Sequence, residues 1–421
     1  MIDVLVVGAG PAGSAAALAA ARAGKSVVLL ERGPFPGSKN AYGGVVYGRV
    51  LDEVLPNWWE EVPFQRWVTR RSTMVLTDHQ ALTVDFRTTD WGAAPYNGCT
   101  VYRADFDSWL ADKAVEAGAR LVTSTVATGL IVEDGVVVGV TTDRPDGDLR
   151  ATTVIAADGV NSFLAKQLGL LPKTDAAHLT LGVKEVLALP RDVIEERFGV
   201  RGDEGVDVEI LGCTRGIPGG GFLYTNRDTL SVGVVVSVQH LAEAKVRPEE
   251  LIADLKAHPG IAPWVAGATV KEYAAHLIPE GGYDHMPELS APGFLVTGDA
   301  AGLCLAAGIW LEGVNFAIGS GLAAGRAAAS GDLKTYRKDL ASTFVLADHK
   351  RLRGAPSLVL SDRVQQQYPG MIADLVQGLF TVTNPSPKPG ALRLLRQAAK
   401  DNGVKLRHLA ADGLRGGRVF R

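Results

Sequence analysis

Four residues near the start of the chain have the types and spacing that bind a dinucleotide. Gly8, Gly10 and Gly13 form a G-x-G-x-x-G pattern between an apolar strand at residues 4–7 and an Ala-rich helix. The first glycine permits a tight turn, the second lets the backbone approach a pyrophosphate, and the third allows close helix–strand packing. The phosphates then meet the helix N-terminus. Glu31 ends the next strand, where its carboxylate can accept hydrogen bonds from a ribose diol. A chance glycine-rich turn would give no reason for an acid at this position.

Two acid–glycine pairs also follow apolar strands, at Asp158-Gly159 and Gly298-Asp299. With the dinucleotide pattern, they resemble the glutathione-reductase-type flavoproteins, in which the late Gly-Asp pair holds the ribityl and phosphate region of FAD. The resemblance implies FAD as the cofactor and a contact from Asp299 to the ribityl hydroxyls. A purely structural turn is the alternative for Asp158. No second dinucleotide pattern for NAD(P)H is found.

Arg103 opens the segment RADFD, and the same resemblance implies that it contacts the cofactor. A surface ion pair with Asp105 is the alternative. A long helix at residues 313–330 should point its N-terminus at the flavin ring. The partial positive charge of that helix end would stabilise an anionic reduced flavin.

These residues need an α/β framework to hold them. Residues 3–31 are predicted to form strand, helix and strand, whereas strand-like segments dominate between about 178 and 280. The predicted fold is therefore a glutathione-reductase-type FAD-binding Rossmann domain with an inserted antiparallel-sheet substrate domain and a helical C-terminal region. The expected division is 1–170 with 285–330 for FAD binding, 171–284 for the substrate or quinone, 331–383 for the helical region, and 384–421 for a linker and basic tail.

Composition excludes several kinds of site. The 421 residues include 49 glycines, an excess that suggests many close backbone approaches, but only three cysteines (Cys99, Cys213 and Cys304). Three distant cysteines exclude a disulfide framework, a four-cysteine zinc site and an iron–sulfur cluster held by this chain alone, and no metal site is predicted. The net charge of −3 argues against general nucleic-acid binding. Residues 385–421, however, carry nine Lys or Arg and two acids, so this tail could dock an acidic protein or an anionic lipid surface, or be solvated.

Several longer segments resemble the FixC family, the bacterial relatives of electron-transfer-flavoprotein:quinone oxidoreductase, and the resemblance extends to about residue 383. One of them comprises residues 37–40 (GSKN) with Gly43, Gly44 and Tyr47. The others are 156–162 (AADGVNS), 181–186 (LGVKEV), 219–226 (GGGFLYTN), 298–302 (GDAAG) and 367–369 (QYP).

The resemblance implies a complete set of partners. Members of the family take electrons from an electron-transfer flavoprotein, here FixA/FixB-like, and deliver them to a membrane quinone. The long members carry a C-terminal cluster domain that this chain lacks, which implies a separate ferredoxin-like FixX partner. Neither a signal-peptide pattern nor a transmembrane run is found, so a cytoplasmic protein peripheral to the inner face of the cell membrane is expected. Residues 42–55 and 303–311 resemble parts that enter the lipid, and Trp58-Trp59 could be an interfacial anchor or buried core.

The predicted sites fall into two groups. Quinone contact is implied for Gly219, Gly220 and Phe222, where residues without Cβ would let a flat ring lie against backbone; close strand packing is the alternative. Phe222 and Tyr224 should face away from Leu223. The predicted cofactor contacts are Gly8, Gly10, Ala12, Gly13, Glu31, Arg32, Asn40, Gly43, Gly44, Arg103, Val126, Asp158, Gly159, Gly298, Asp299, Gly308, Gly313 and Asn315.

One segment departs from the family. Residues 310–315 read WLEGVN where relatives usually have an Arg and an Asp flanking Gly-Met, which puts the acceptor in doubt. No catalytic residue is certain; Tyr224 and Glu312 are the candidates for a proton route, and a structural carboxylate is the alternative for Glu312. Three other functions stay open: a geranylgeranyl-reductase-like enzyme that saturates isoprenoid double bonds, an aromatic hydroxylase, and a non-catalytic FAD-binding scaffold.

Overall fold

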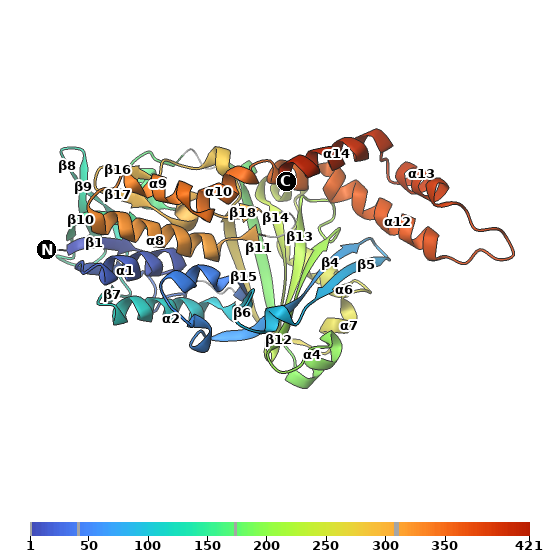
Figure 1. Ribbon diagram of the computed structural model, residues 1–421, viewed down its shortest axis with the longest axis horizontal. Coiled ribbons are helices and arrows are strands. Elements are labelled where there is room, and N and C mark those ends of the chain that lie inside the picture. Colours follow the sequence, from blue (N-terminus) through green and yellow to red (C-terminus); the bar gives the residue numbers. More distant parts are fainter. Residues whose placement is uncertain (1, 40–42, 172–174, 307–310) are drawn as a thin grey trace.

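The computed structural model describes residues 2–39, 43–171, 175–306 and 311–421. Its first sheet has eight strands and contains the parallel order β17-β10-β1-β2-β7, with β16 antiparallel at one edge and the β8–β9 hairpin attached through β9 to β10 (Figure 1). The predicted hairpin turn is confirmed, because Asp134 and Gly135 both have positive φ between the paired strands. The strands are β1 (Ile2–Val7), β2 (Val27–Leu30), β7 (Arg120–Val122), β8 (Ala127–Glu133), β9 (Val136–Thr142), β10 (Leu149–Ala156), β16 (Ser290–Ala291) and β17 (Phe294–Val296).

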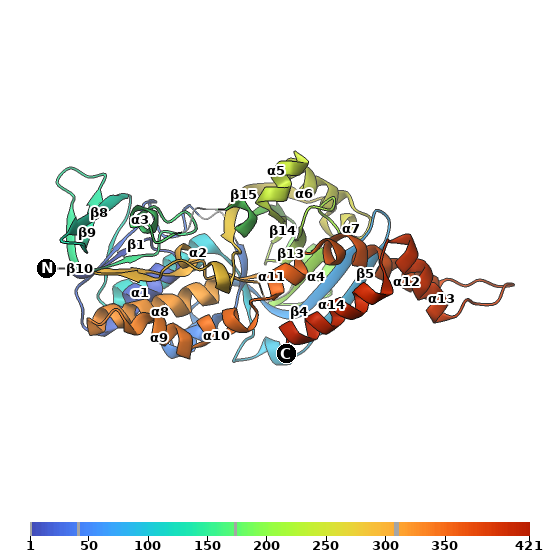
Figure 2. The ribbon, with the colours of Figure 1, turned by 90° about the horizontal axis from the view of Figure 1, so that it is seen from above.

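Two helices rich in small residues, α1 and α8, pack on one face of this sheet, and the β8–β9 hairpin lies on the other face (Figure 2). They approach closely because α8 carries Gly321 and Gly325, where a Cβ would lie 2.1 Å from the carbonyl oxygen of Ala12 and 2.3 Å from that of Ala16. The helices of this half are α1 (Pro11–Arg22), α2 (Arg103–Glu116), α3 (Phe163–Gln167), α8 (Val314–Ser330), α9 (Thr335–Ser342) and α10 (Phe344–Arg351).

A second sheet of nine strands has the order β15-β11-β14-β13-β12-β4-β6-β3, with β5 paired to β4. All pairs are antiparallel except β12 with β4, which run parallel. Residues 43–102, which the predicted division places with the FAD-binding domain, supply four of these strands. The strands are β3 (Gly43–Val46), β4 (Phe64–Leu76), β5 (Ala81–Arg87), β6 (Cys99–Tyr102), β11 (Leu179–Ala188), β12 (Glu204–Leu211), β13 (Gly219–Thr225), β14 (Thr229–Ser237) and β15 (Thr269–Pro279).

One face of the second sheet forms its own apolar core. Strand side chains alternate between faces, so Val206, Val208 and Ile210 enter this core with Leu223, while their sequence neighbours point to the opposite face. Four helices belong to this half: α4 (Arg191–Phe198), α5 (Val238–Ala244), α6 (Pro248–Ala257) and α7 (Ala262–Val265).

The C-terminal helices α11 to α14 form an arm that extends from the second sheet (Figures 1 and 2). Residues 384–390, predicted as a linker, join α12 to α13 outside any helix. Asp412 of α14 accepts two hydrogen bonds from Arg363 (2.6 and 2.8 Å) and one from the Tyr368 hydroxyl (2.6 Å), which tie the end of the chain to the arm. The helices are α11 (Ala355–Val359), a π-helical turn (Arg363–Gln367), α12 (Tyr368–Phe380), α13 (Ala391–Asp401) and α14 (Leu406–Val419).

Short elements complete the structure. Within the described ranges, no helix is both long and apolar enough to cross a bilayer. Trp58 is 2% exposed and packs edge-on against Trp59 and Trp67, so the core interpretation of Trp58 holds.

The 3₁₀ helices are Gly48–Glu53, Trp58–Glu60, Asp90–Gly92, Ala176–His178, Tyr283–His285 and Gly298–Ala301. The two-stranded sheet pairs β18 (Leu305–Ala306) with β19 (Leu311–Glu312).

Candidate active site

The three glycines after β1 have different surroundings. Gly8 has φ +102°, and a Cβ there would lie 2.3 Å from the carbonyl oxygen of Ala157. A Cβ on Gly13 would lie 1.8 Å from the carbonyl oxygen of Gly8, so close helix–strand packing requires glycine. At Gly10, by contrast, the nearest atom would be Nη2 of Arg103 at 3.9 Å. Gly8 and Gly13 therefore serve the packing, whereas Gly10 leaves the helix N-terminus open to a ligand.

Glu31 stands beside this loop at the end of β2. Its two carboxylate oxygens accept hydrogen bonds from the backbone N–H groups of Ala9 (3.1 Å) and Gly33 (2.7 Å). These bonds hold the carboxylate in a fixed position against the loop. Each oxygen keeps a lone pair that can accept a further bond from a sugar hydroxyl.

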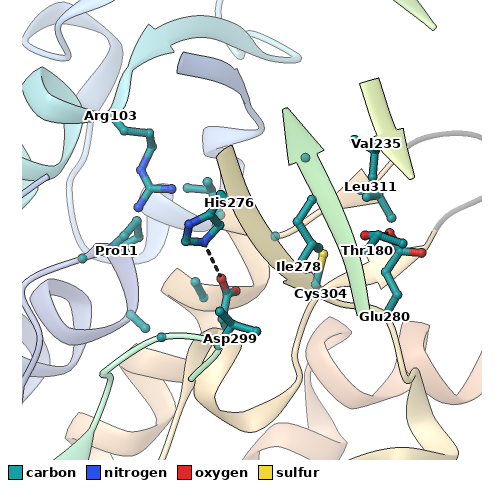
Figure 3. Close-up of a pocket in the computed structure, with 18 of the residues that line it drawn as sticks. Pro11, Arg103, Thr180, Val235, His276, Ile278, Glu280, Asp299, Cys304 and Leu311 are labelled. Carbon is teal, nitrogen blue, oxygen red and sulfur yellow. Dashed lines mark hydrogen bonds and ion pairs between the residues drawn. The ribbon is translucent and has the colours of Figure 1, made fainter. Parts of the chain in front are cut away.

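Arg103, predicted to contact the cofactor, makes an ion pair, but not with Asp105, the partner that the alternative interpretation named. Its guanidinium donates to both oxygens of Asp107 (2.7 and 2.9 Å), which lies one helical turn further along α2, rather than pairing with Asp105. Figure 3 shows Arg103, His276 and Asp299 turned toward one space, with His276 Nε2 4.0 Å from the Asp299 carboxylate. The pair with Asp107 aims the guanidinium at the predicted cofactor site.

A single continuous cavity of about 460 Å³ joins the dinucleotide loop to the second sheet. Its wall includes both groups of predicted residues as well as the N-terminus of α8. The predicted members in the wall are Gly8, Gly10, Ala12, Glu31, Arg32, Arg103, Val126, Asp158, Gly159, Asp299, Gly313, Gly219, Gly220, Phe222 and Tyr224. Among the described residues, Gly13, Gly43, Gly44, Gly298, Glu312 and Asn315 are not in the wall. Asn40 and Gly308 lie outside the described residues, as do residue 42 and part of 303–311 from the segments predicted to enter lipid.

The second sheet supplies the far wall of the cavity through alternate residues. Phe222 and Tyr224 line it with their rings stacked 4.9 Å apart, while Leu223 is buried in the core behind them, as predicted. Gly182 and Val235 sit on neighbouring strands in register with Gly220. This stretch of wall is thus flat and apolar, with little side-chain bulk.

Four polar residues on this wall were missed by the sequence analysis as site residues. Asp207 and Glu209 follow each other on one face of β12 and flank Arg71 of β4, whose Nε lies 3.3 Å from Asp207 and whose Nη2 hydrogen-bonds Glu209. The Arg71 guanidinium lies 5.8 Å from the ring centre of Tyr47. Burial raises the pKa of Asp207 well above its usual value, and Glu209 adds to this effect. The alternation in VDVEI was the available signal, but Arg71 lies 136 positions away and could not be placed.

Glu280 is a further acid in the cavity wall that the sequence did not single out. It accepts a hydrogen bond of 2.6 Å from the Thr180 hydroxyl, and Figure 3 shows the two side chains together. Burial raises the pKa of Glu280 from 4.5 to about 7, against the opposing effect of that hydrogen bond. Glu280 therefore changes its charge near neutral pH.

The raised pKa of Glu280 predicts a pH-dependent stability difference. The folded state binds the Glu280 proton more tightly than the unfolded state, so this residue lowers stability as the pH rises from 4.5 to about 7. Glu280→Gln removes that loss. Between pH 4.5 and pH 8, the difference in the free energy of unfolding between the variant and wild type should shift by up to about 3 kcal/mol in favour of the variant. Urea denaturation measures this difference. A difference between the two proteins that stays constant with pH would contradict the assignment.

Two other candidates have local partners. Asp158 accepts a long hydrogen bond (3.4 Å) from the backbone N–H of Leu164, and its Oδ1 is buried with no partner among the described residues. Burial raises the pKa of Asp158. Glu312 accepts a hydrogen bond of 2.8 Å from the Asn315 amide, which supports the structural interpretation of this carboxylate.

Known proteins resemble this chain over part or nearly all of its length. A family model described as FAD dependent oxidoreductase matches residues 3–166. Protein FixC of Salmonella typhi is 39% identical over 99% of this chain and 98% of its own. The chain belongs to the FixC family. A second relative is the probable electron transfer flavoprotein-quinone oxidoreductase YdiS of Escherichia coli K12. It is 37% identical to this FixC family member over 98% of both chains. A solved geranylgeranyl bacteriochlorophyll reductase-like protein from Thermoplasma acidophilum shares the fold, at a TM-score of 0.70 and 21% identity over 95% of this chain and 96% of its own.

The FixC family member is an FAD-dependent oxidoreductase, and the predictions of family, fold class and cofactor are confirmed. The cavity fits FAD in three respects. Gly10 leaves room for the pyrophosphate, and Glu31 is placed to accept hydrogen bonds from a ribose. Asp158 Oδ1, which has no partner among the described residues, can accept a hydrogen bond. When bound, FAD supplies reversible two-electron storage. The contacts of individual residues with it stay predictions.

Proposed function

We propose that this protein receives electrons from an electron-transfer flavoprotein, stores them on FAD and passes them to a membrane quinone. The observation that carries the proposal is the continuity of the cavity. One space runs from the dinucleotide loop to the flat wall at Gly182, Gly220 and Phe222, so an aromatic acceptor could lie beside the cofactor. The name of the YdiS relative supports the electron donor and the acceptor.

A ferredoxin-like FixX subunit is the second proposed partner. The chain has three cysteines, and each is far in sequence from the others. An iron–sulfur cluster needs four ligands, usually thiolates. A cluster in this system would therefore belong to another subunit.

The test is an anaerobic turnover assay with reduced electron-transfer flavoprotein, the FAD-loaded protein and a soluble menaquinone analogue, with the ferredoxin partner added in a second series. Quinol should form at a rate proportional to the concentration of the FAD-loaded protein. The same mixture with the FAD-free protein is the control. Failure to form quinol in both series would refute the proposal, and saturation of a supplied prenyl lipid would favour the reductase alternative.

We further propose that the C-terminal arm contacts an anionic lipid surface. Phe380 and Val382, at the end of α12, are 81% and 69% exposed, and Leu392 at the start of α13 is 58% exposed. Nine Lys or Arg against two acids lie in residues 385–421. Exposed apolar groups beside cations are the combination that binds an anionic membrane interface. Helix α11 contacts α14 and lines the cavity through Pro356 and Val359, so the arm adjoins the acceptor site.

Removing the apolar tip of the arm should weaken vesicle binding. Burying a phenylalanine and a valine contributes about 3 kcal/mol, so Phe380→Ser with Val382→Ser should lower the partition onto anionic vesicles at least tenfold. Flotation with phosphatidylglycerol vesicles measures it. Val270→Ser, an exposed valine of β15, is the matched control. Unchanged flotation of the double variant, or equal binding to neutral vesicles, would contradict the assignment.

A further inference from the structure

The second sheet buries two acids and one cation on the wall of the cavity. Asp207 and Glu209 are 3% and 7% exposed, and both line the cavity with Arg71. The antiparallel register places Asp207 opposite Tyr224 and Glu209 opposite Phe222. The two carboxyl groups are therefore next to the stacked rings that form the proposed quinone wall.

The charges around the two acids do not balance when both are ionised. Arg71 of β4 is the cation that pairs with both of them. Among the described residues, the other titratable groups here are Tyr47, whose pKa is raised by burial, and Tyr224 of β13. Glu312 of β19 adds a more distant negative charge that acts on Tyr47. Since an isolated buried charge is costly, the favourable state has one ionised carboxylate beside Arg71 and one protonated carboxyl group.

The geometry distinguishes the two acids. Glu209 accepts a direct hydrogen bond from Nη2 of Arg71. Asp207 is 3.3 Å from Nε of the same guanidinium, and its Oδ1 is buried with no hydrogen-bond partner among the described residues. A protonated Asp207 would be a hydrogen-bond donor in the wall of the cavity.

We propose that Asp207 and Glu209 hold one proton between them and that Asp207 donates it to a carbonyl oxygen of the bound quinone. This inference rests on the proposed function, because the quinone is the acceptor. Reduction of a quinone to a quinol takes two electrons and two protons, and the reduced flavin supplies two electrons and one proton. Asp207 supplies the other proton: its O–H bond breaks, an O–H bond forms on the quinone oxygen, and Asp207 is left as a carboxylate. Water entering after the quinol leaves restores the proton.

The stored proton can be tested without any acceptor. In the FAD-loaded protein at pH 7, the infrared difference spectrum of wild type minus Asp207→Asn should contain a carboxylic-acid C=O band; both proteins carry Glu280→Gln, because Glu280 is itself partly protonated at this pH. Glu204→Gln, on the same strand but exposed and paired with Arg87, is the matched control and should keep the band. In Glu209→Gln, Asp207 is the acid that still pairs with Arg71, so this band should disappear at a lower pH than in wild type. Absence of this band from the difference spectrum would overturn the stored proton.

The donation step has its own measurement. Anaerobic reoxidation of the dithionite-reduced protein by a soluble quinone should be about 100-fold slower in Asp207→Asn, the range expected for loss of a general acid. Reduction by dithionite and FAD content should be unchanged, and Glu204→Gln should react like wild type. As the pH rises, the reoxidation rate of Glu209→Gln should begin to fall at a lower pH than that of wild type. A merely structural role of Glu209 would not produce this shift. An unslowed Asp207→Asn would overturn the donation. If wild type itself fails to react, the proposed function and the donation fall together, and the infrared band still decides the stored proton.

Discussion

Gly10→Val is expected to leave the protein folded and to lower its affinity for FAD at least about 100-fold. Gly10 has φ −77°, which any residue adopts, and a Cβ there meets no protein atom closer than 3.9 Å. The added methyl groups would instead occupy the space in front of the α1 N-terminus. Two charge-assisted hydrogen bonds from backbone N–H groups to the pyrophosphate contribute about 3 kcal/mol, and losing them corresponds to that factor.

Gly13→Ala is the informative partner of this variant. Its Cβ would lie 1.8 Å from the carbonyl oxygen of Gly8, so α1 must move away from β1. We expect a destabilised or unfolded protein, whereas Gly10→Val should keep the circular dichroism spectrum and the unfolding temperature of the FAD-free wild type. Flavin fluorescence quenching measures the affinity. A Gly10→Val protein that binds FAD as tightly as wild type would show that the pyrophosphate does not lie at this loop.

Gly182→Val is expected to slow quinone reduction about 10- to 100-fold while FAD stays bound. A Cβ at Gly182 would meet only the end of Ile278 at 3.3 Å and other atoms beyond 3.5 Å, so the backbone need not move. Valine also favours a strand. Its methyl groups would project into the cavity beside Val235, and crowding a filled site costs about 1–3 kcal/mol.

The control for this variant lies on the neighbouring strand. Ala275 pairs with Val183 and is exposed on the sheet face away from the cavity, so Ala275→Val places a valine elsewhere on the same sheet. Stopped-flow reoxidation of the reduced flavin by a quinone analogue measures both variants. Equal rates for Gly182→Val and wild type would place the acceptor somewhere other than against this wall.

The local part of the site could be predicted from the sequence. The spacing of Gly8, Gly10, Gly13 and Glu31 reports a strand–turn–helix–strand unit whose contacts are all nearby in the chain. The alternation of Phe222 with Leu223 likewise predicts which face each occupies. In these cases the period of the secondary structure determines which side chains meet.

The long-range part could not be predicted. Arg71 meets Asp207 because β4 and β12 pair in parallel across 136 positions, and no local pattern reports such a pairing. For the same reason, residues 43–102 were expected in the first domain although their strands complete the second sheet. The partner of Arg103 was predictable in principle, since Asp107 is four residues along a helix and Asp105 is only two.

We propose that FAD bound in this cavity gives its electrons to a quinone. The most direct test mixes the FAD-loaded protein, reduced photochemically, with one equivalent of a menaquinone analogue in the absence of oxygen. Oxidised-flavin absorbance should return with formation of one quinol per flavin, and Gly182→Val should slow both together. Flavin that stays reduced until oxygen is admitted would contradict it.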